Sequence, residues 1–233
     1  MRKLVIIPAY NEAESIKEVI ENLTKNYPQY DYIIVNDGSK DRTLEVCLEN
    51  HYKVLDLPIN LGIGGAVQCG YRYALKYDYD IAIQMDGDGQ HDPKYLDAIT
   101  AIIEREEAEV VVGSRFIEKE GFQSSASRRL GINILSIWGK FLSGYRLKDI
   151  TSGYRAVSKK LIKIFAEDYP SDFPEPEAMI MAKINGFRIM EYPVVMHERT
   201  NGISSINIRK SIYYMIKVSL AMLIRRISLG FRR

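Results

Sequence analysis

The chain has 233 residues, enough for one large domain or two small ones with a sizeable hydrophobic core. Hydrophobic residues make up 46% of it and charged residues 27%, ordinary proportions for a soluble globular protein. The net charge of +2 conceals an asymmetry, because residues 209–233 hold seven basic side chains and no acidic one. A weakly acidic body with a basic end predicts contact with an anionic surface, and it argues against nucleic-acid binding.

The first half of the chain alternates short apolar runs with segments of helical periodicity. Runs rich in β-branched residues predict strands at 3–9, 30–37, 53–57, 80–85 and 109–113. The segments between them predict helices at 11–26, 39–51, 63–77 and 92–106. This alternation is typical of a mostly parallel sheet covered by helices on both faces, so we predict an α/β fold.

The second half is less regular. Residues 127–144 predict an amphipathic helix, and residues 187–196 predict a strand pair or a bent strand that returns to the sheet. Because no linker rich in Pro, Gly or Ser interrupts the chain, we expect one domain over residues 1–206 and a basic amphipathic helix over residues 207–233.

The cysteines and the N-terminus indicate a cytosolic protein. Cys47 and Cys69 lie in helix-like stretches without C-x-x-C spacing, which predicts reduced core thiols and not a disulfide or a metal pair. The first residues run directly into a strand, without the apolar region and cleavage site of a signal peptide.

Three polar segments follow predicted strands at their carboxyl ends. They are residues 8–12 after the first strand, 36–39 after the second and 86–92 after the fourth. Ligands of open parallel sheets bind at the carboxyl ends of the strands. We therefore expect these segments to meet at one edge of the sheet and to form a site.

The third segment, "QMDGDGQHDP" (residues 84–93), places Asp86, Asp88 and Asp92 close together. A solvated turn would explain its Gly and Asp residues without chemistry. A calcium loop is disfavoured, because His91 stands where an EF-hand needs glycine. The D-x-D pair favours Mg²⁺ or Mn²⁺ holding a diphosphate, since these ions combine carboxylates with phosphate oxygens and water. Asp92, just before a proline, is more simply a helix N-cap.

At this point the sequence resembles a known family. The motifs "IIPAYNE", "VNDGSKDRT", "NLGIGGA", "QMDGDGQHDP", "GSRF" and "DITSGYRA" occur in the order and spacing of family 2 glycosyltransferases. Over residues 3–205 the chain looks most like the dolichyl-phosphate mannose and polyprenyl-phosphate sugar synthases. The resemblance implies a GT-A (Rossmann-like) fold, a nucleotide-sugar donor, a Mg²⁺ or Mn²⁺ cofactor and a polyprenyl (undecaprenyl or dolichyl) phosphate acceptor.

The resemblance also implies site residues. The donor pocket would be formed by Pro8, Tyr10, Glu12, Val35, Asp37 and Asp86. The metal would be held by Asp86, Asp88 and Gln90. The acceptor phosphate would be bound by Arg115, Arg128, Arg129, Ser152, Arg199 and Ser204. Of these, Asp88, Arg115 and Arg199 are the expected catalytic residues, although ordinary turns, helix caps and surface ion pairs remain open alternatives at individual positions.

Two further details concern the donor. Val67 stands where a dinucleotide fingerprint needs its third glycine, so we expect Gly64 instead to let a helix N-terminus approach the donor. Many mannose synthases have Lys after the serine that matches Ser204, but this chain has Ser205. Together with "FPEPEAMI" and "GISSI", which look like bacterial polyprenyl-phosphate transferases, this favours a UDP-sugar such as UDP-N-acetylglucosamine or UDP-glucose over GDP-mannose.

The C-terminal segment favours a lipid acceptor. Its longest uncharged run, residues 218–224, is far too short to span a bilayer. One face would carry Ile212, Ile216, Leu220, Leu223 and Ile227. Such a basic helix suits the plane of an anionic membrane, here the cytoplasmic face. The alternatives are that it packs on the protein, on a small membrane partner or in a homo-oligomer.

The expected chemistry needs no strong general base, because a phosphate acceptor is already anionic near neutral pH. Positioning and electrostatics would then drive attack at the sugar C1 with inversion. A saccharide hydroxyl acceptor is the first alternative, and it would need Asp149 or Asp168 as a base. The Q-x-x-R-W element of processive synthases is absent, since the only tryptophan is Trp138 in "SIWGK". The second alternative is a non-catalytic nucleotide-sugar-binding module.

Overall fold

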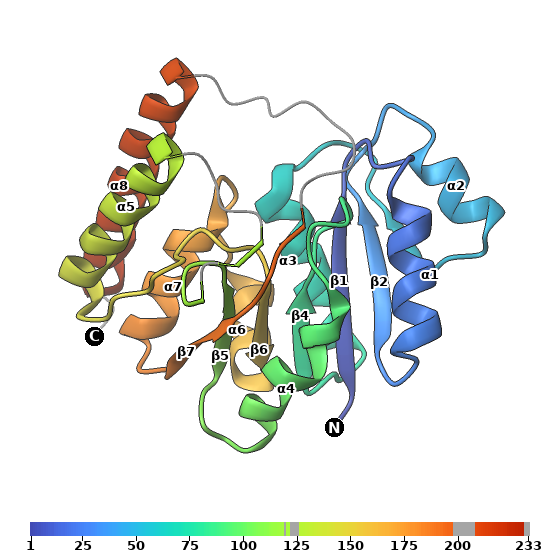
Figure 1. The fold of residues 1–233 in the computed structure, drawn as a ribbon, viewed down its shortest axis with the longest axis horizontal. Helices are drawn as coiled ribbons and strands as arrows, with labels where there is room; N and C mark the ends of the chain where they lie inside the picture. Colours follow the sequence, from blue (N-terminus) through green and yellow to red (C-terminus); the bar gives the residue numbers. More distant parts are fainter. Residues whose placement is uncertain (119, 122–125, 198–207, 231–233) are drawn as a thin grey trace.

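The computed structural model describes residues 1–118, 120–121, 126–197 and 208–230, and its centre is a seven-stranded sheet (Figure 1). The strands are β1 (Lys3–Ala9), β2 (Asp31–Asn36), β3 (Val54–Asp56), β4 (Ile81–Gln84), β5 (Val110–Ser114), β6 (Arg155–Ser158) and β7 (Ile189–Pro193). The helices are α1 (Ile16–Asn26), α2 (Thr43–Glu49), α3 (Gly62–Lys76), α4 (Leu96–Glu104), α5 (Ala126–Ser143), α6 (Lys159–Glu167), α7 (Pro174–Ile184) and α8 (Ile208–Gly230), with a 3₁₀ turn at Pro93–Tyr95.

The strand order is β3-β2-β1-β4-β6-β5-β7. Neighbours pair in parallel except at β6, which is antiparallel to both β4 and β5. The mostly parallel sheet and its first five strands confirm the sequence prediction. The sequence pattern predicted no strand at β6. Of the two alternatives for residues 187–196, the structure has a single strand that returns to the sheet, the parallel edge strand β7, and not a strand pair.

Helices cover both faces of the sheet, as predicted. Along β1, Leu4 and Ile6 point into a core with α3, α6 and α7, and Val5 and Ile7 point into a core with α1 and α4. This follows from the alternation of side chains along a strand, since every second residue faces the same way. The two cysteines are free thiols, as expected.

Helix α8 lies beside α5 at the end of the molecule away from α1 and α2 (Figure 1). Val218 and Met222 of α8 are buried in the core that α7 also lines, and Trp138 Nε1 of α5 donates to the Ser219 carbonyl at 3.0 Å. The predicted apolar face is therefore partly wrong: Leu223 packs against this core, and Ile224 is exposed in its place. Within the described part of the chain, no helix is long and apolar enough to cross a membrane.

Candidate active site at the carboxyl edge of the sheet

The three predicted polar segments meet in one pocket of about 160 Å³. The first two contribute Tyr10 and Asp37, and the third contributes Asp86 and Asp88. The complete lining is Pro8, Ala9, Tyr10, Glu12, Asp37, Ile63, Ala66, Asp86, Gly87 and Asp88. The structure thus brings together five of the residues predicted for the donor and one further metal-ligand candidate.

The segments after β1 and β2 are fastened to each other by hydrogen bonds. The backbone N–H of Asn11, whose φ is +57°, donates to Ser39 Oγ, and Asn11 Oδ1 accepts from the Lys40 backbone N–H at 2.8 Å. The Glu12 N–H donates to Thr43 Oγ1 at 2.8 Å. Asparagine tolerates a positive φ, so Asn11 turns the chain out of β1 and holds one wall of the pocket in place.

Asp37 organises a second wall. Its carboxylate Oδ1 accepts the Leu61 backbone N–H at 2.7 Å, so it holds the turn that begins α3. Burial raises the pKa of Asp37, although the N–H groups of Leu61 and Gly62 oppose this. Gly38 is needed beside it, because its φ is +64° and an added Cβ would lie 2.9 Å from the Asn60 nitrogen.

Two predicted donor residues do not line the pocket. Val35 is fully buried in the core, because its side chain alternates with that of Ile34 along a strand covered on both faces. Gly64 donates its N–H to the Ser171 carbonyl, and an added Cβ would lie 2.0 Å from the Pro170 carbonyl oxygen. The glycine therefore permits contact between α3 and the loop before α7, and Ile63 and Ala66 occupy the pocket-facing positions.

The acidic segment forms a compact turn. Asp88 is buried, and its Oδ1 accepts the Gln90 backbone N–H at 3.0 Å. The Gln90 side-chain amide donates to the His197 carbonyl at 3.3 Å, which fixes the amide plane. Asp92 caps the following 3₁₀ turn by accepting the Lys94 N–H, as the sequence predicted.

The residues predicted to bind a metal offer carboxylate and amide oxygens, which suit Mg²⁺ or Mn²⁺. Among the residues that the structure describes, none is a hydrogen-bond partner of the buried Asp86 Oδ1. Gly153 leaves room beside this carboxylate, since an added Cβ there would lie 3.3 Å from both oxygens. Over the described ranges, no three His, Cys, Asp or Glu side chains cluster as a complete metal site. The donor set therefore fits an ion whose remaining ligands come from a bound diphosphate and water.

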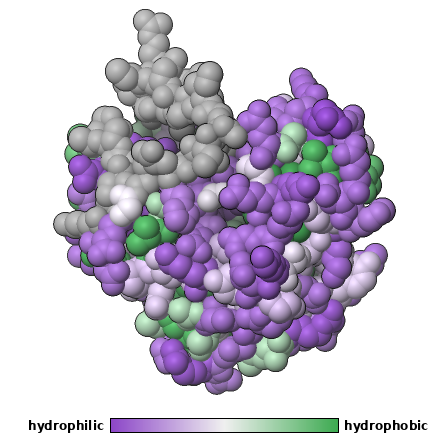
Figure 2. Space-filling view, turned by 45° about the vertical axis from the view of Figure 1, so that its right-hand side comes forward, coloured by the Kyte–Doolittle hydropathy of each residue, from purple (hydrophilic) through white to green (hydrophobic). Residues whose placement is uncertain are grey.

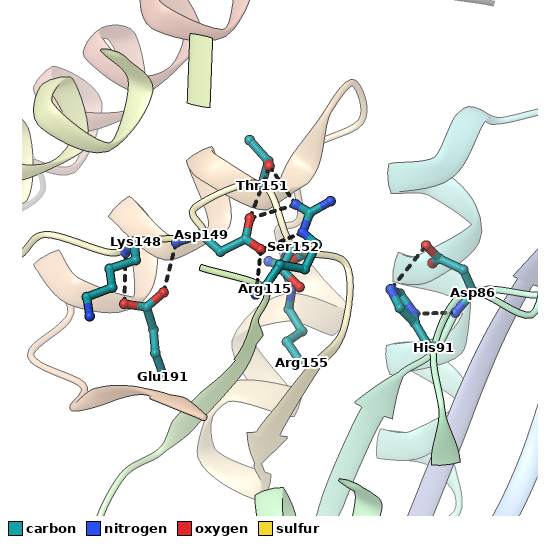
Figure 3. Close-up of polar contacts among 9 residues, drawn as sticks. All are labelled: Asp86, His91, Arg115, Lys148, Asp149, Thr151, Ser152, Arg155 and Glu191. Carbon is teal, nitrogen blue, oxygen red and sulfur yellow. Dashed lines mark hydrogen bonds and ion pairs between the residues drawn. The ribbon is translucent and has the colours of Figure 1, made fainter. Parts of the chain in front are cut away.

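A buried ion pair lies across from the acidic turn (Figure 3). Arg115 is 8% exposed, and its Nε and Nη2 donate to the two oxygens of Asp149 at 2.7 Å each. The Arg115 backbone N–H donates to the same carboxylate, which is 0% exposed. The Asp149 and Lys148 backbones are in turn held by Glu191 of β7. Asp149 therefore positions Arg115, and it is inaccessible as a base.

The first turn of α5 brings Arg128 near Arg115. Desolvation and the positive charge of Arg115 lower the pKa of Arg128. Desolvation by burial raises the pKa of Tyr214 on α8, while both arginine charges lower it, which places its phenol in their neighbourhood. By accessible surface, Arg128 and the next residue on α5, Arg129, are both exposed, so the desolvation of Arg128 is partial. Guanidinium groups suit phosphate, so Arg115 and Arg128 are candidates for binding an anion.

Two further polar residues belong to this region: the sequence indicated Arg155 only as a basic residue in a loop-like setting, and it did not identify Glu175. Arg155 is fully buried in β6, where it donates to the Ser152 carbonyl at 2.6 Å and to the Glu175 carbonyl at 3.4 Å. Burial raises the pKa of Glu175 at the start of α7. The charge of Arg155 lowers this pKa, and the charge of Asp86 raises it further. The predicted acceptor residue Ser152 is 1% exposed, which gives its hydroxyl no surface for a ligand. Arg199 and Ser204 lie outside the described residues.

Comparison with known proteins identifies the family. The sequence model of glycosyl transferase family 2 matches residues 4–165. A UDP-N-acetylglucosamine–dolichyl-phosphate N-acetylglucosaminyltransferase of Methanococcus voltae is 36% identical, over 82% of this chain and 83% of the relative. A polyprenol monophosphomannose synthase of Mycolicibacterium smegmatis is 29% identical, over 91% of this chain and 84% of the relative.

The solved structures support the same fold. Glucosyl-3-phosphoglycerate synthase from Mycobacterium tuberculosis, crystallised with Mn²⁺, UDP and phosphoglyceric acid, has a TM-score of 0.74 at 17% identity, covering 97% of this chain and 78% of the other. That likeness shows a GT-A architecture, and the C-terminal helix is present in this chain. By the family match and the 36% identity to the Methanococcus voltae relative, the chain belongs to glycosyl transferase family 2.

Proposed function

We propose that the protein transfers a sugar, with inversion, from a nucleotide-sugar to a polyprenyl phosphate at the membrane surface. The observation that carries the proposal is that acidic and basic side chains lie on opposite sides of one site. Asp86 and Asp88 line the donor pocket, and Arg115 lies across from them with Arg128 close by. Relatives that use dolichyl or polyprenyl phosphates support the same reaction.

Asp86, Asp88 and the Gln90 amide oxygen would hold Mg²⁺ or Mn²⁺. Such an ion would neutralise charge on the leaving nucleoside diphosphate. The crystallisation of structural neighbours with Mn²⁺ or Mg²⁺ supports a divalent ion in this place. The fixed Gln90 amide supports it further, because its Nε2 bond to the His197 carbonyl leaves Oε1 as the available ligand atom.

The acceptor phosphate would lie between Arg115 and Arg128, with Arg129 and Arg199 as further candidates for the same anion. Arg115 needs no movement to take part, since Asp149 already holds its guanidinium in one orientation. A phosphate oxygen is anionic near neutral pH and attacks the sugar C1 without losing a proton to the protein. The repulsion between donor and acceptor anions is offset by the arginines on one side and the metal on the other.

The burial of Asp149 weakens the hydroxyl-acceptor alternative, and Asp168 is paired with Arg225 at 2.7 Å. One observation still supports a hydroxyl acceptor. Glu175 is partly buried near Asp86 and has the raised pKa that a general base would need. Replacing Glu175 by Gln distinguishes the two cases, because only a hydroxyl acceptor would lose transfer through loss of a base.

Helices α5 and α8 would place the protein on the cytoplasmic face of the membrane. They expose a row of large apolar side chains: Leu130, Ile134, Ile137, Phe141, Tyr213, Ile216, Leu220, Ile224 and Ile227. Every charged residue of these two helices is basic, which suits anionic headgroups. By contrast, the view that brings the α1 and α2 side forward is mainly hydrophilic (Figure 2). A small membrane partner or a second copy of the chain would compete for the same face.

The donor is proposed to be a UDP-sugar, such as UDP-N-acetylglucosamine or UDP-glucose, with GDP-mannose as the competitor. The Methanococcus voltae relative, named for UDP-N-acetylglucosamine, supports the first, and the mannose synthase supports the second. Cell-wall or surface glycosylation would use the lipid-linked product.

Incubation with Mn²⁺, undecaprenyl phosphate and a panel of labelled UDP- and GDP-sugars tests the proposal. We expect labelled lipid from one donor, and no product when EDTA removes the metal. The matched control replaces Asp92 by Ala. Asp92 belongs to the same acidic turn, but its carboxylate caps the following 3₁₀ turn and contacts Lys94 and His197, and it is not a proposed metal ligand. Absence of labelled lipid from every donor would refute the transfer.

A further inference from the structure

His91 is a buried residue of the acidic turn whose ring folds back over Asp86 (Figure 3). The Asp86 backbone N–H donates to His91 Nδ1 at 3.0 Å. His91 Nε2 lies 3.8 Å from Asp86 Oδ2. One side chain thus contacts both the backbone and the carboxylate of a single residue, five positions earlier in the chain.

The hydrogen bond determines the tautomer of the ring. A nitrogen that accepts a bond from a backbone N–H carries no proton, so the ring proton is on Nε2. That Nε2–H faces the Asp86 carboxylate. The opposite oxygen, Oδ1, has no partner within the part of the chain that the structure describes. The ring therefore lies along the Oδ2 side of the carboxylate, at a distance longer than a hydrogen bond.

The ring is packed on one further side, and the His91 backbone is anchored separately. It stacks on Tyr154 with a centroid distance of 4.9 Å and an interplanar angle of 13°. Tyr154 is fully buried, and its hydroxyl donates to the Asp92 carbonyl at 3.0 Å. The His91 backbone forms an isolated antiparallel bridge with Met196. These contacts join the acidic turn to the segments beside β6 and β7, so the ring has little freedom to rotate.

We propose that His91 is a positioning residue, which fixes the Asp86 backbone and carboxylate in the orientation that binds the divalent ion. The inference rests on the proposed metal-dependent transfer and adds a residue to which no role has been given. The principal contact is the bond from the Asp86 N–H to Nδ1, because it is the shortest contact between the two residues. Partners that orient metal-binding carboxylates in this way commonly affect affinity by about 10–100-fold.

Amide replacements separate the two nitrogens of the ring. Asparagine places an oxygen acceptor near the position of Nδ1, and glutamine places its amide near the position of Nε2. We expect H91A to weaken Mn²⁺ binding by about 10–100-fold. H91N should return the affinity toward the wild-type value, whereas H91Q should resemble H91A. The matched control is H51N, since His51 is an exposed histidine elsewhere whose φ of +55° asparagine tolerates.

The measurement is the dissociation constant of Mn²⁺ alone, obtained from the electron paramagnetic resonance signal of the free ion, with thermal unfolding recorded for each variant. Unchanged affinity in H91A, or equal weakening in H91N and H91Q, would overturn the proposal. If H91A does not fold, the comparison of H91N with H91Q decides the question. Failure of the wild-type protein to bind Mn²⁺ would instead refute the metal assignment of the site, and the role of His91 with it.

Discussion

Removal of the Asp149 carboxylate tests how the acceptor side of the site is held together. The change D149A leaves the Arg115 guanidinium buried without the carboxylate that accepts its Nε and Nη2 at 2.7 Å. Breaking a buried pair by deleting one partner destabilises a protein by about 3–5 kcal/mol, because an uncompensated charge remains inside. Replacing both partners by apolar residues of similar volume is often close to neutral. The structure therefore predicts opposite outcomes for the single and the double variant.

Urea unfolding followed by circular dichroism measures the free energy of unfolding of the wild type, D149A, R115M and the R115M/D149L double variant. We expect D149A to lose about 3–5 kcal/mol, and the double variant to regain most of that loss. Transfer to polyprenyl phosphate should be absent in the double variant, because the Arg115 guanidinium that would bind the acceptor is missing. A D149A protein within about 1 kcal/mol of the wild type would refute the buried pair. Wild-type transfer by the double variant would refute the acceptor role of Arg115.

Three other predictions follow from the site and the surface. D88A should abolish both Mn²⁺ binding and transfer, as measured by titration and product assay; normal turnover would contradict the metal assignment. Burial raises the pKa of Glu175 in the folded protein above its ordinary value of 4.5. The neutral Glu175 carboxyl therefore stabilises the fold fully below pH 4.5, and this stabilisation is lost as the pH rises through the folded pKa. E175Q should therefore raise the free energy of unfolding at alkaline pH and leave it unchanged below 4.5; identical pH profiles would contradict this. F141D should weaken co-sedimentation with phosphatidylglycerol vesicles about tenfold or more, since burying a Phe side chain contributes about 1.5–3 kcal/mol. The control variant L48D on α2 should bind the vesicles as the wild type does. Equal losses in the two variants would argue against membrane binding by the α5–α8 face.

The parallel half of the fold was predictable because its strands are continuous apolar runs. The central residues of β1, β2 and β4 are buried on both faces, so each strand has an apolar centre that is easily recognised, with polar residues only at its ends. The convergence of the polar segments was predictable for a related reason. Parallel strands direct their carboxyl ends to one edge, and Pro8, Asp37 and Asp86 do line one pocket.

Strand β6 was not predictable from local pattern, because it has four residues and two of them, Arg155 and Ser158, are polar. Its position depends on pairing with β4 and β5, which are distant in sequence. The same limitation applies to α8. Helical spacing showed that the helix is amphipathic, but only packing against α5 and α7 shows that Leu223 faces inward and Ile224 outward. The roles of the site residues remain predictions.

The position of β6 also affects how the chain acquires its structure during synthesis. Strand β4 ends at residue 84, but the strand that covers its free edge begins at residue 155. A ribosome must therefore release roughly seventy further residues before that edge is paired. Until then the growing chain presents an open strand edge with three apolar residues, Ile81, Ala82 and Ile83, which is a template for aggregation. Fragments that end before residue 155 should be insoluble, although they contain every loop of the donor pocket.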